Sequence, residues 1–400
     1  MKKIQLIINF ILIICFLSNC GSKNDASPES EGFFIKLLGA GNSDEATEFF
    51  LDSQDKIIGL ATQSFKELDV NKISPLLFRT DKFGNQTLMK RIAGIQGNTI
   101  RPTADGGVII LSGSKTALSN TDYFFVIKLK ADDSVEWTKS FAPTNANDDR
   151  LDILGSSIEQ VSDGYIISIS SKYTIPTLNQ EYVYLWKIDN TGNLLRSTYF
   201  GDPATTNRSS KSRALANNDV VMAGSYNQYM RIMLSNSLGS FKWDYALYHP
   251  NSAEKAVGND VQIANAGFVV GGTITKTTGE TDGLVIKTNS DGKIEWQSRF
   301  GGENNQRINS ITNTPDGGYV VTGTTDVVFK GTLNDNIWVV KLNSSGNVEW
   351  QKDFGSPKDD VGSCVRVASN GNIVVLGTVI YETTPMLALI ELTPNGETKK

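Results

Sequence analysis

Carboxylate and amide side chains recur in short polar loops, each of which follows an aromatic-rich run. The loops are Asn42-Ser43-Asp44-Glu45, Asn147-Asp148-Asp149, Glu303-Asn304-Asn305 and Lys358-Asp359-Asp360. Oxygen ligands of this kind bind Ca²⁺, and they also hydrogen-bond sugar hydroxyl groups. The candidate ligand ring consists of Asp44, Asp148, Asp149, Asn305, Asp359 and Asp360. The same residue types stabilise turns through their own backbone, and this structural role is the simpler interpretation.

Other signatures of catalysis or metal binding are sparse. His249 is the single histidine, and we interpret it as a solvated loop residue rather than a general base. A zinc site combines several His and Cys ligands, which this chain lacks. The sequence also contains no GxSxG elbow, no Walker-type loop and no strand-linked GxGxxG. We therefore predict no catalytic residue, no metal site beyond the weak candidate ring, and no cofactor, with Ca²⁺ alone left open.

The N-terminus has the pattern of a secretory signal. Two lysines precede an apolar run that ends at Leu17, and this run is too short to span a bilayer as a helix. The following Ser18-Asn19-Cys20 resembles a bacterial lipobox, which implies diacylation (palmitate) at Cys20. We expect residues 1–19 to be a signal peptide, residues 20–31 a flexible tether, and residues 32–400 the folded domain. Gly21, in place of an aspartate, favours the outer membrane over the inner membrane, in either leaflet.

Cysteine usage and charge limit the other possibilities. Besides Cys15 and Cys20, only Cys364 remains, within an apolar run, so it is expected in the core and no intrachain disulfide is expected. The formal net charge is −5, which argues against nucleic acid as a partner because phosphate binding requires a basic surface. We expect a monomer that binds a protein or a glycan.

A repeat of about 53 residues governs the folded region. Its clearest part is an apolar run such as YVVTGT. Copies of this run begin at Lys56, Val108, Tyr165, Val220, Phe268, Tyr319 and Ile373. Each repeat also contains a VxKL-type run, a tryptophan-containing run and a run like INSITNT. A fixed period with four short strands per unit predicts a β-propeller, here with seven blades.

Tryptophan occupies one column of the repeat, at Trp137, Trp243, Trp296 and Trp350, and the fourth repeat places Arg196 there. The N-terminal repeat begins at Phe33 with a tryptophan-type strand, and the C-terminal repeat ends with the VxKL-type run from Met386. We therefore expect the C-terminal strand to pair into the N-terminal blade and close the ring. The long linkers, such as residues 326–335, are interpreted as crossovers, which would place the VxKL strand nearest the axis.

The alternation of VxKLxxxG, WxxxFG and DGGYVVxGxT resembles the SBBP-type and delta-60-type propeller repeats of exported bacterial proteins, over about nine-tenths of the chain. This resemblance implies an all-β propeller that is similar to quinoprotein propellers in fold only. A quinoprotein cofactor site often includes a vicinal disulfide, for which this chain lacks the cysteines. We expect a lipid-anchored envelope protein with a non-enzymatic binding or scaffold propeller. The alternative is a glycan-active enzyme that uses loop carboxylates such as Asp359 or Asp360.

Overall fold

The computed structural model describes residues 35–39, 42–68, 70–94, 96–114, 123–141, 151–175, 178–201, 206–248 and 254–398, without the side chains of residues 151–156 and 171–180. Every regular element in these residues is a β-strand. None of them forms an apolar helix long enough to cross a membrane. The proposed lipid site at Cys20, the tether, His249, Asp148 and Asp149 lie outside the described residues.

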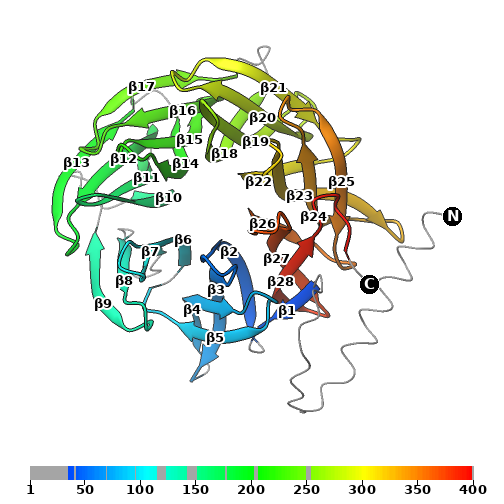
Figure 1. Ribbon diagram of the computed structural model, residues 1–400, viewed down its shortest axis with the longest axis horizontal. Coiled ribbons are helices and arrows are strands. Elements are labelled where there is room, and N and C mark those ends of the chain that lie inside the picture. The colour runs from blue at the N-terminus through cyan, green and yellow to red at the C-terminus, as the bar shows by residue number, and fades with distance from the viewer. Residues whose placement is uncertain are drawn as a thin grey trace. The chain divides into compact units, whose positions relative to one another are not determined.

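The strands form seven antiparallel sheets of four strands each, arranged as blades in a ring (Figure 1). Blades 1 to 3 contain β2 (Ser43–Leu51), β3 (Ile57–Glu67), β4 (Val70–Thr80), β5 (Gln86–Arg91); β6 (Gln96–Pro102), β7 (Val108–Ser114), β8 (Tyr123–Leu129), β9 (Val135–Phe141); and β10 (Leu151–Val161), β11 (Gly164–Ile175), β12 (Leu178–Ile188), β13 (Leu194–Phe200). Blades 4 to 6 contain β14 (Asn207–Ala214), β15 (Val220–Tyr226), β16 (Tyr229–Ser235), β17 (Phe241–Ala246); β18 (Lys255–Ala264), β19 (Gly267–Thr275), β20 (Thr281–Asn289), β21 (Ile294–Phe300); and β22 (Gln306–Asn313), β23 (Tyr319–Phe329), β24 (Thr332–Leu342), β25 (Val348–Phe354). The all-β, seven-bladed prediction is confirmed.

The closing blade 7 is shared between the two ends of the chain. Its sheet contains β26 (Val361–Val367), β27 (Ile373–Tyr381), β28 (Thr384–Leu392) and the N-terminal β1 (Ile35–Leu38). The C-terminal strand β28 pairs with β1 from Ile35 opposite Ile390 to Leu38 opposite Leu387. The predicted closure is therefore confirmed. Buried Cys364 contributes to the core between this blade and blade 1, as expected.

The strand nearest the axis differs from our prediction. The INSITNT-type strands (β2, β6, β10, β14, β18, β22 and β26) surround the centre, and the tryptophan strands lie outermost (Figure 1). The VxKL strand is the third from the axis, so its predicted axial position is wrong. The linker 326–335 is not a crossover, because β23 and β24 extend through it as one hairpin with Asp326 opposite Asp335. The actual crossovers are the short polar loops, such as residues 301–305.

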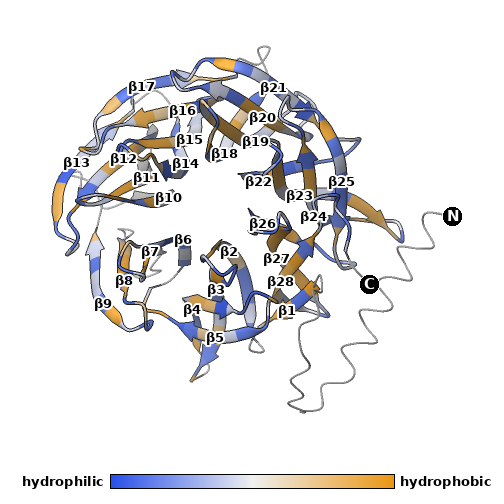
Figure 2. Ribbon diagram, in the orientation of Figure 1, coloured by the Kyte–Doolittle hydropathy of each residue, from blue (hydrophilic) through white to orange (hydrophobic). Residues whose placement is uncertain are grey.

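Burial explains this order. The second and third strands of each blade are continuous apolar runs because neighbouring blades cover both of their faces. The outermost strands alternate between half-buried and exposed residues. Figure 2 shows the same contrast between largely hydrophobic middle strands and mixed outer strands. The core consists of layers between successive blades.

Tryptophans of the outer strands cover the turns of the next blade. The indole Nε1 of Trp137 donates to the carbonyl of Asn190 at 3.1 Å, and that of Trp350 donates to Pro394 at 3.0 Å. Each ring lies against the positive-φ glycine two residues further on, Gly192 or Gly396. A Cβ atom on that glycine would lie only 2.8 or 2.9 Å from the indole. Glycine therefore provides both the turn geometry and the room for the ring.

Charged side chains join the inner strands across the axis. The Glu48 side chain, 2 % exposed, pairs with Arg101 at 2.8 Å, Lys211 at 3.2 Å and Arg366 at 3.1 Å. These cations come from blades 2, 4 and 7. Although burial acts to raise the pKa of Glu48, the three charges hold it well below its usual range. Glu48 thus connects four inner strands through a single carboxylate.

Candidate functional site

The two ends of the ring carry different connections. Because strands alternate in direction, the crossovers and the hairpins between second and third strands share one end, which we call the hairpin face. The tight turns between first and second strands and between third and fourth strands lie at the other end, the turn face. The predicted ring of polar residues belongs to crossovers, so it lies on the hairpin face. The described members fall into two groups.

Asp44 and Asp360 are both buried, and Asp360 holds its own loop. Both oxygens of Asp360 accept hydrogen bonds, one from the backbone N–H of Ser356 and the other from that of Ile380 at 2.8 Å. Burial raises the pKa of Asp360. Asp44 accepts a hydrogen bond from Gln63 at 2.6 Å. In the crossover before blade 6, Gln306 replaces the carboxylate and accepts from Gly302 at 2.9 Å. These side chains therefore stabilise the crossovers from inside.

Asn305 and Asp359 are partly exposed and connect crossovers to hairpins. Asn305 Oδ1 accepts from the backbone N–H of Thr281 at 3.1 Å, and its Nδ2 donates to Asp326 at 2.8 Å. Asp359 Oδ1 accepts from the backbone N–H of Asp335 at 3.1 Å. Asn305 and Asp359 therefore fix the two crossovers on either side of blade 6 to the base of its hairpin.

Three carboxyl groups meet at that base, and two of them were not among the predicted residues. Asp326 and Asp335 face each other across β23 and β24 and share a hydrogen bond, with Asp359 nearby. Burial, the bond to Asp326 and the charges of Asp326 and Asp359 raise the pKa of Asp335 to about 6. Burial acts to raise the pKa of Asp326 as well, but hydrogen bonds from Asp335 and Asn305 lower it. The near-symmetric segment DVVFKGTLND, with an acid at each end of a Lys-Gly turn, was the signal available in the sequence.

The described acids do not form the site that the predicted ring suggested. Within the described ranges, no group of three or more His, Cys, Asp or Glu residues is arranged to hold a metal ion. Retaining and inverting glycosidases need two carboxyl groups at least about 5 Å apart around a sugar. Asp360 is fully buried against backbone donors, and Asp326 and Asp335 are in direct contact. The contact between Asp326 and Asp335 leaves no room for a sugar between these two carboxyl groups.

Exposed apolar side chains gather on three hairpins of the same face. The β3–β4 hairpin carries Leu68, which is 94 % exposed, together with Val70 and Ile73. The β23–β24 hairpin carries Val328, Phe329 and Leu333, and the β27–β28 hairpin carries Tyr381. These hairpins belong to blades 1, 6 and 7, which are neighbours because blade 7 packs between the other two. We call these seven residues the apolar hairpin patch.

Comparisons with known proteins provide information about the fold only. No family model matches the chain, and no curated protein is similar to it in sequence. Among solved structures, Sqt1 from Chaetomium thermophilum is similar with a TM-score of 0.51 and 10 % identity, over 90 % of this chain and 85 % of the other. Puromycin hydrolase is similar with a TM-score of 0.50 and 10 % identity, over 89 % of this chain and 54 % of the hydrolase. At such low identity these similarities show the propeller fold alone.

Proposed function

We propose that this protein is a lipid-anchored component of a bacterial envelope whose propeller is a non-enzymatic binding or scaffold module. The observation that supports this proposal is the apolar hairpin patch on three adjacent blades. Exposed apolar patches on a folded domain are typical of interaction sites, and all seven of these residues lie on the hairpin face. The loop carboxylates, in contrast, are engaged in hydrogen bonds that stabilise crossovers and hairpins.

The point where the chain enters the propeller supports this arrangement. Ile35 pairs with Ile390, close to the turn at residues 393–396, so β1 begins toward the turn face and ends toward the hairpin face. A lipid at Cys20, followed by the polar tether, would attach to the turn-face end of β1. In this proposal the hairpin face binds a protein or glycan ligand.

One experiment with two readouts tests the proposal. The wild-type chain and a Cys20→Ala variant are expressed in a diderm bacterium, and membranes are separated from the soluble fraction. We expect wild-type protein in outer membranes and the variant in the soluble fraction, because a cysteine is required for acylation. A variant that stayed membrane-bound would exclude the proposed anchor.

The soluble Cys20→Ala chain is then used to capture envelope proteins and glycans, with and without Leu68→Glu, Val328→Glu and Phe329→Glu. We expect the triple variant to lose specific ligands, because charge on the patch opposes burial. The matched control carries glutamate at Val135, Ile294 and Val348, which are exposed on outer strands. Equal loss in both triple variants would contradict a binding role for the hairpin face.

A further inference from the structure

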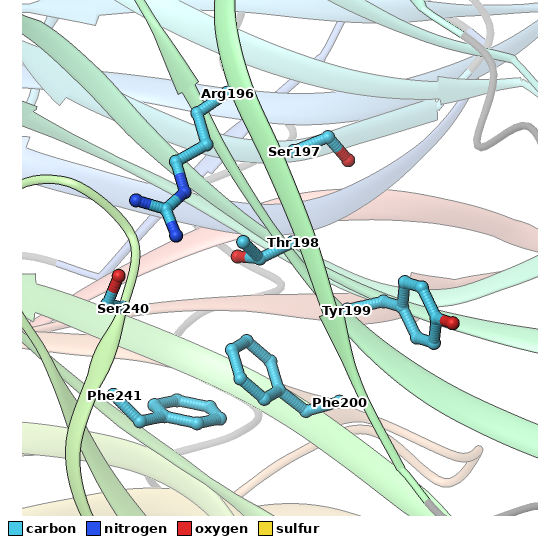
Figure 3. A pocket seen from close by; sticks show the side chains of 7 residues that line it. All are labelled: Arg196, Ser197, Thr198, Tyr199, Phe200, Ser240 and Phe241. Atoms are coloured by element: carbon cyan, nitrogen blue, oxygen red, sulfur yellow. The ribbon is translucent and has the colours of Figure 1, made fainter.

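One inter-blade junction has an open cavity where four equivalent junctions contain an indole ring; blade 1 has Leu88 at the equivalent position. The cavity has a volume of about 460 Å³ and lies between blades 3 and 4. Figure 3 shows its lining. The residues are Arg196, Ser197, Thr198, Tyr199, Phe200, Ser240 and Phe241. No carboxylate is among these seven.

The repeat explains why the cavity exists. Arg196 pairs with Lys187 in the register in which Trp350 pairs with Lys341, so it occupies the tryptophan position. At the filled junctions, a Cβ atom on Gly292 or Gly346 would meet Trp243 at 3.1 Å or Trp296 at 2.6 Å. The equivalent Gly239 of blade 4 would meet no ring, and its nearest neighbour is Leu185 at 3.7 Å. The space beside Gly239, which we call the slot, is therefore formed by the same kind of turn but contains no indole ring.

The remaining walls suit an aromatic ring. Phe200 and Phe241 form the apolar floor, with ring centroids 3.9 Å apart. Thr198 Oγ1 donates to the carbonyl of Gly239 at 2.9 Å and fixes the turn beside the slot. The Arg196 guanidinium is directed toward Ser240 (Figure 3). A cation in this position stabilises a bound ring through its π face.

A second substitution extends the apolar surface beyond the slot. In blades 2, 5 and 6, the residue before the tryptophan is a glutamate that pairs with a buried lysine, as Glu349 pairs with Lys341 at 2.9 Å. Blade 3 has Leu195 there, 58 % exposed, and Tyr199 on the same strand is 65 % exposed. In Figure 3, Tyr199 is directed away from the cavity. Tyr199 contacts the rings of Tyr182 and Tyr184 on the other face of the strand. A single free ring would fill the slot but leave Leu195 uncovered, whereas a polypeptide segment would cover both the slot and Leu195.

We propose that the cavity at β13 binds a tryptophan side chain from a partner polypeptide. The incoming indole takes the place that Trp137, Trp243, Trp296 and Trp350 take at the filled junctions. The segment next to it packs against Leu195. This site is separate from the apolar hairpin patch, so either can fail experimentally without the other.

The test uses the full chain and ligand-observed NMR with the capped peptide Gly-Trp-Gly, its counterpart Gly-Ala-Gly, and free indole. We expect saturable binding of the tryptophan peptide, weaker binding of indole and none of the alanine peptide. Arg196→Trp fills the slot, so it abolishes peptide binding and raises the Tm by about 2 °C through better packing. Leu195→Glu leaves the slot open and weakens peptide binding.

Gln351→Trp is the matched control, since it adds an exposed tryptophan to the outer strand of blade 6, where the slot already contains Trp350. It should leave peptide binding unchanged. Undiminished binding to Arg196→Trp, equal binding of both peptides, or no saturable binding would overturn the proposed site. Indole binding as tightly as the peptide would overturn the assignment to a polypeptide.

Discussion

At the scale of single residues, Asp335 is the group whose charge state depends most directly on its surroundings. Its pKa of about 6 is above the ordinary value of 3.8, so the folded protein binds a proton that the unfolded chain has released. Stability from this group is fully present below about pH 4 and is lost as pH rises through about 6. The cost arises because Asp335 is partly buried and because a second carboxylate faces it across the hairpin.

We predict that Asp335→Asn is more stable than the wild type at pH 8 and that the difference disappears at pH 4. Since Asp335 is only partly buried, solvent screens the repulsion, and we expect a gain of about 1 kcal/mol. Urea unfolding at both pH values measures it. Asp291→Asn, at an exposed turn, serves as the control and should behave like the wild type throughout. A gain at pH 4 as large as at pH 8 would refute the electrostatic explanation.

At the scale of elements, the sequence predicted the strands well and their connections less well. Period and turn residues identified the four strands of each blade, because glycine and Asn/Asp mark the turns. The prediction placed the wrong strand nearest the axis because it used the length of a linker as the sign of a crossover. In the protein, residues 326–335 continue β23 and β24, while a short loop makes the crossover. A better indicator of strand order is the pattern of burial along each strand, because the outermost strand of a blade alternates between exposed and half-buried residues.

The candidate sites were predictable to a similar degree. Composition identifies the polar loops, but the hydrogen bonds of Asn305 with Thr281 and of Asp359 with Asp335 depend on how each crossover packs against a neighbouring hairpin. The contact of Asp326 with Asp335 depends on strand register, which one sequence does not specify. Arg196 was visible as an exception in the tryptophan column. The space beside the neighbouring turn is only partly filled, by Phe241, whose ring packs against Phe200.

The strand β1 is the element on which closure depends. Replacing Leu38 by aspartate buries a charge among Leu387, Leu389 and Phe49. We predict that this variant loses about 3 kcal/mol or more of stability. Amide hydrogen exchange should rise first in β26, β27 and β28. The matched control is Lys36→Asp, on the same strand but half-exposed. Uniform acceleration across all blades would contradict a local role for β1.

At the scale of the whole molecule, the ring is held together across its axis as well as between neighbours. Glu48 is the shared partner of cations from blades 2, 4 and 7. Blades 1 and 4 are far apart in sequence and are not adjacent in the ring. Their connection through Lys211 and Glu48 therefore couples opposite sides of the propeller.

We predict that Glu48→Ala destabilises the protein by about 3 to 5 kcal/mol, because it leaves buried cations without their counter-charge. Thermal and urea unfolding measure the loss. Glu67→Ala removes an exposed ion pair with Lys72 and is the control, for which we expect little or no change in stability. Similar losses in the two variants would show that the axial position confers no special importance.

The closing blade also determines how the molecule responds to tension. Within the described residues, which start at Ile35, β1 pairs with β28 through four positions, whereas the outer strands of other blades pair through five or six. A force applied at the N-terminus, with the propeller held by a ligand, loads the Ile35–Ile390 end of this short ladder first. Its hydrogen bonds then break one after another, as in the opening of a zipper. The ring is thus mechanically weakest at the strand that joins it to the preceding chain.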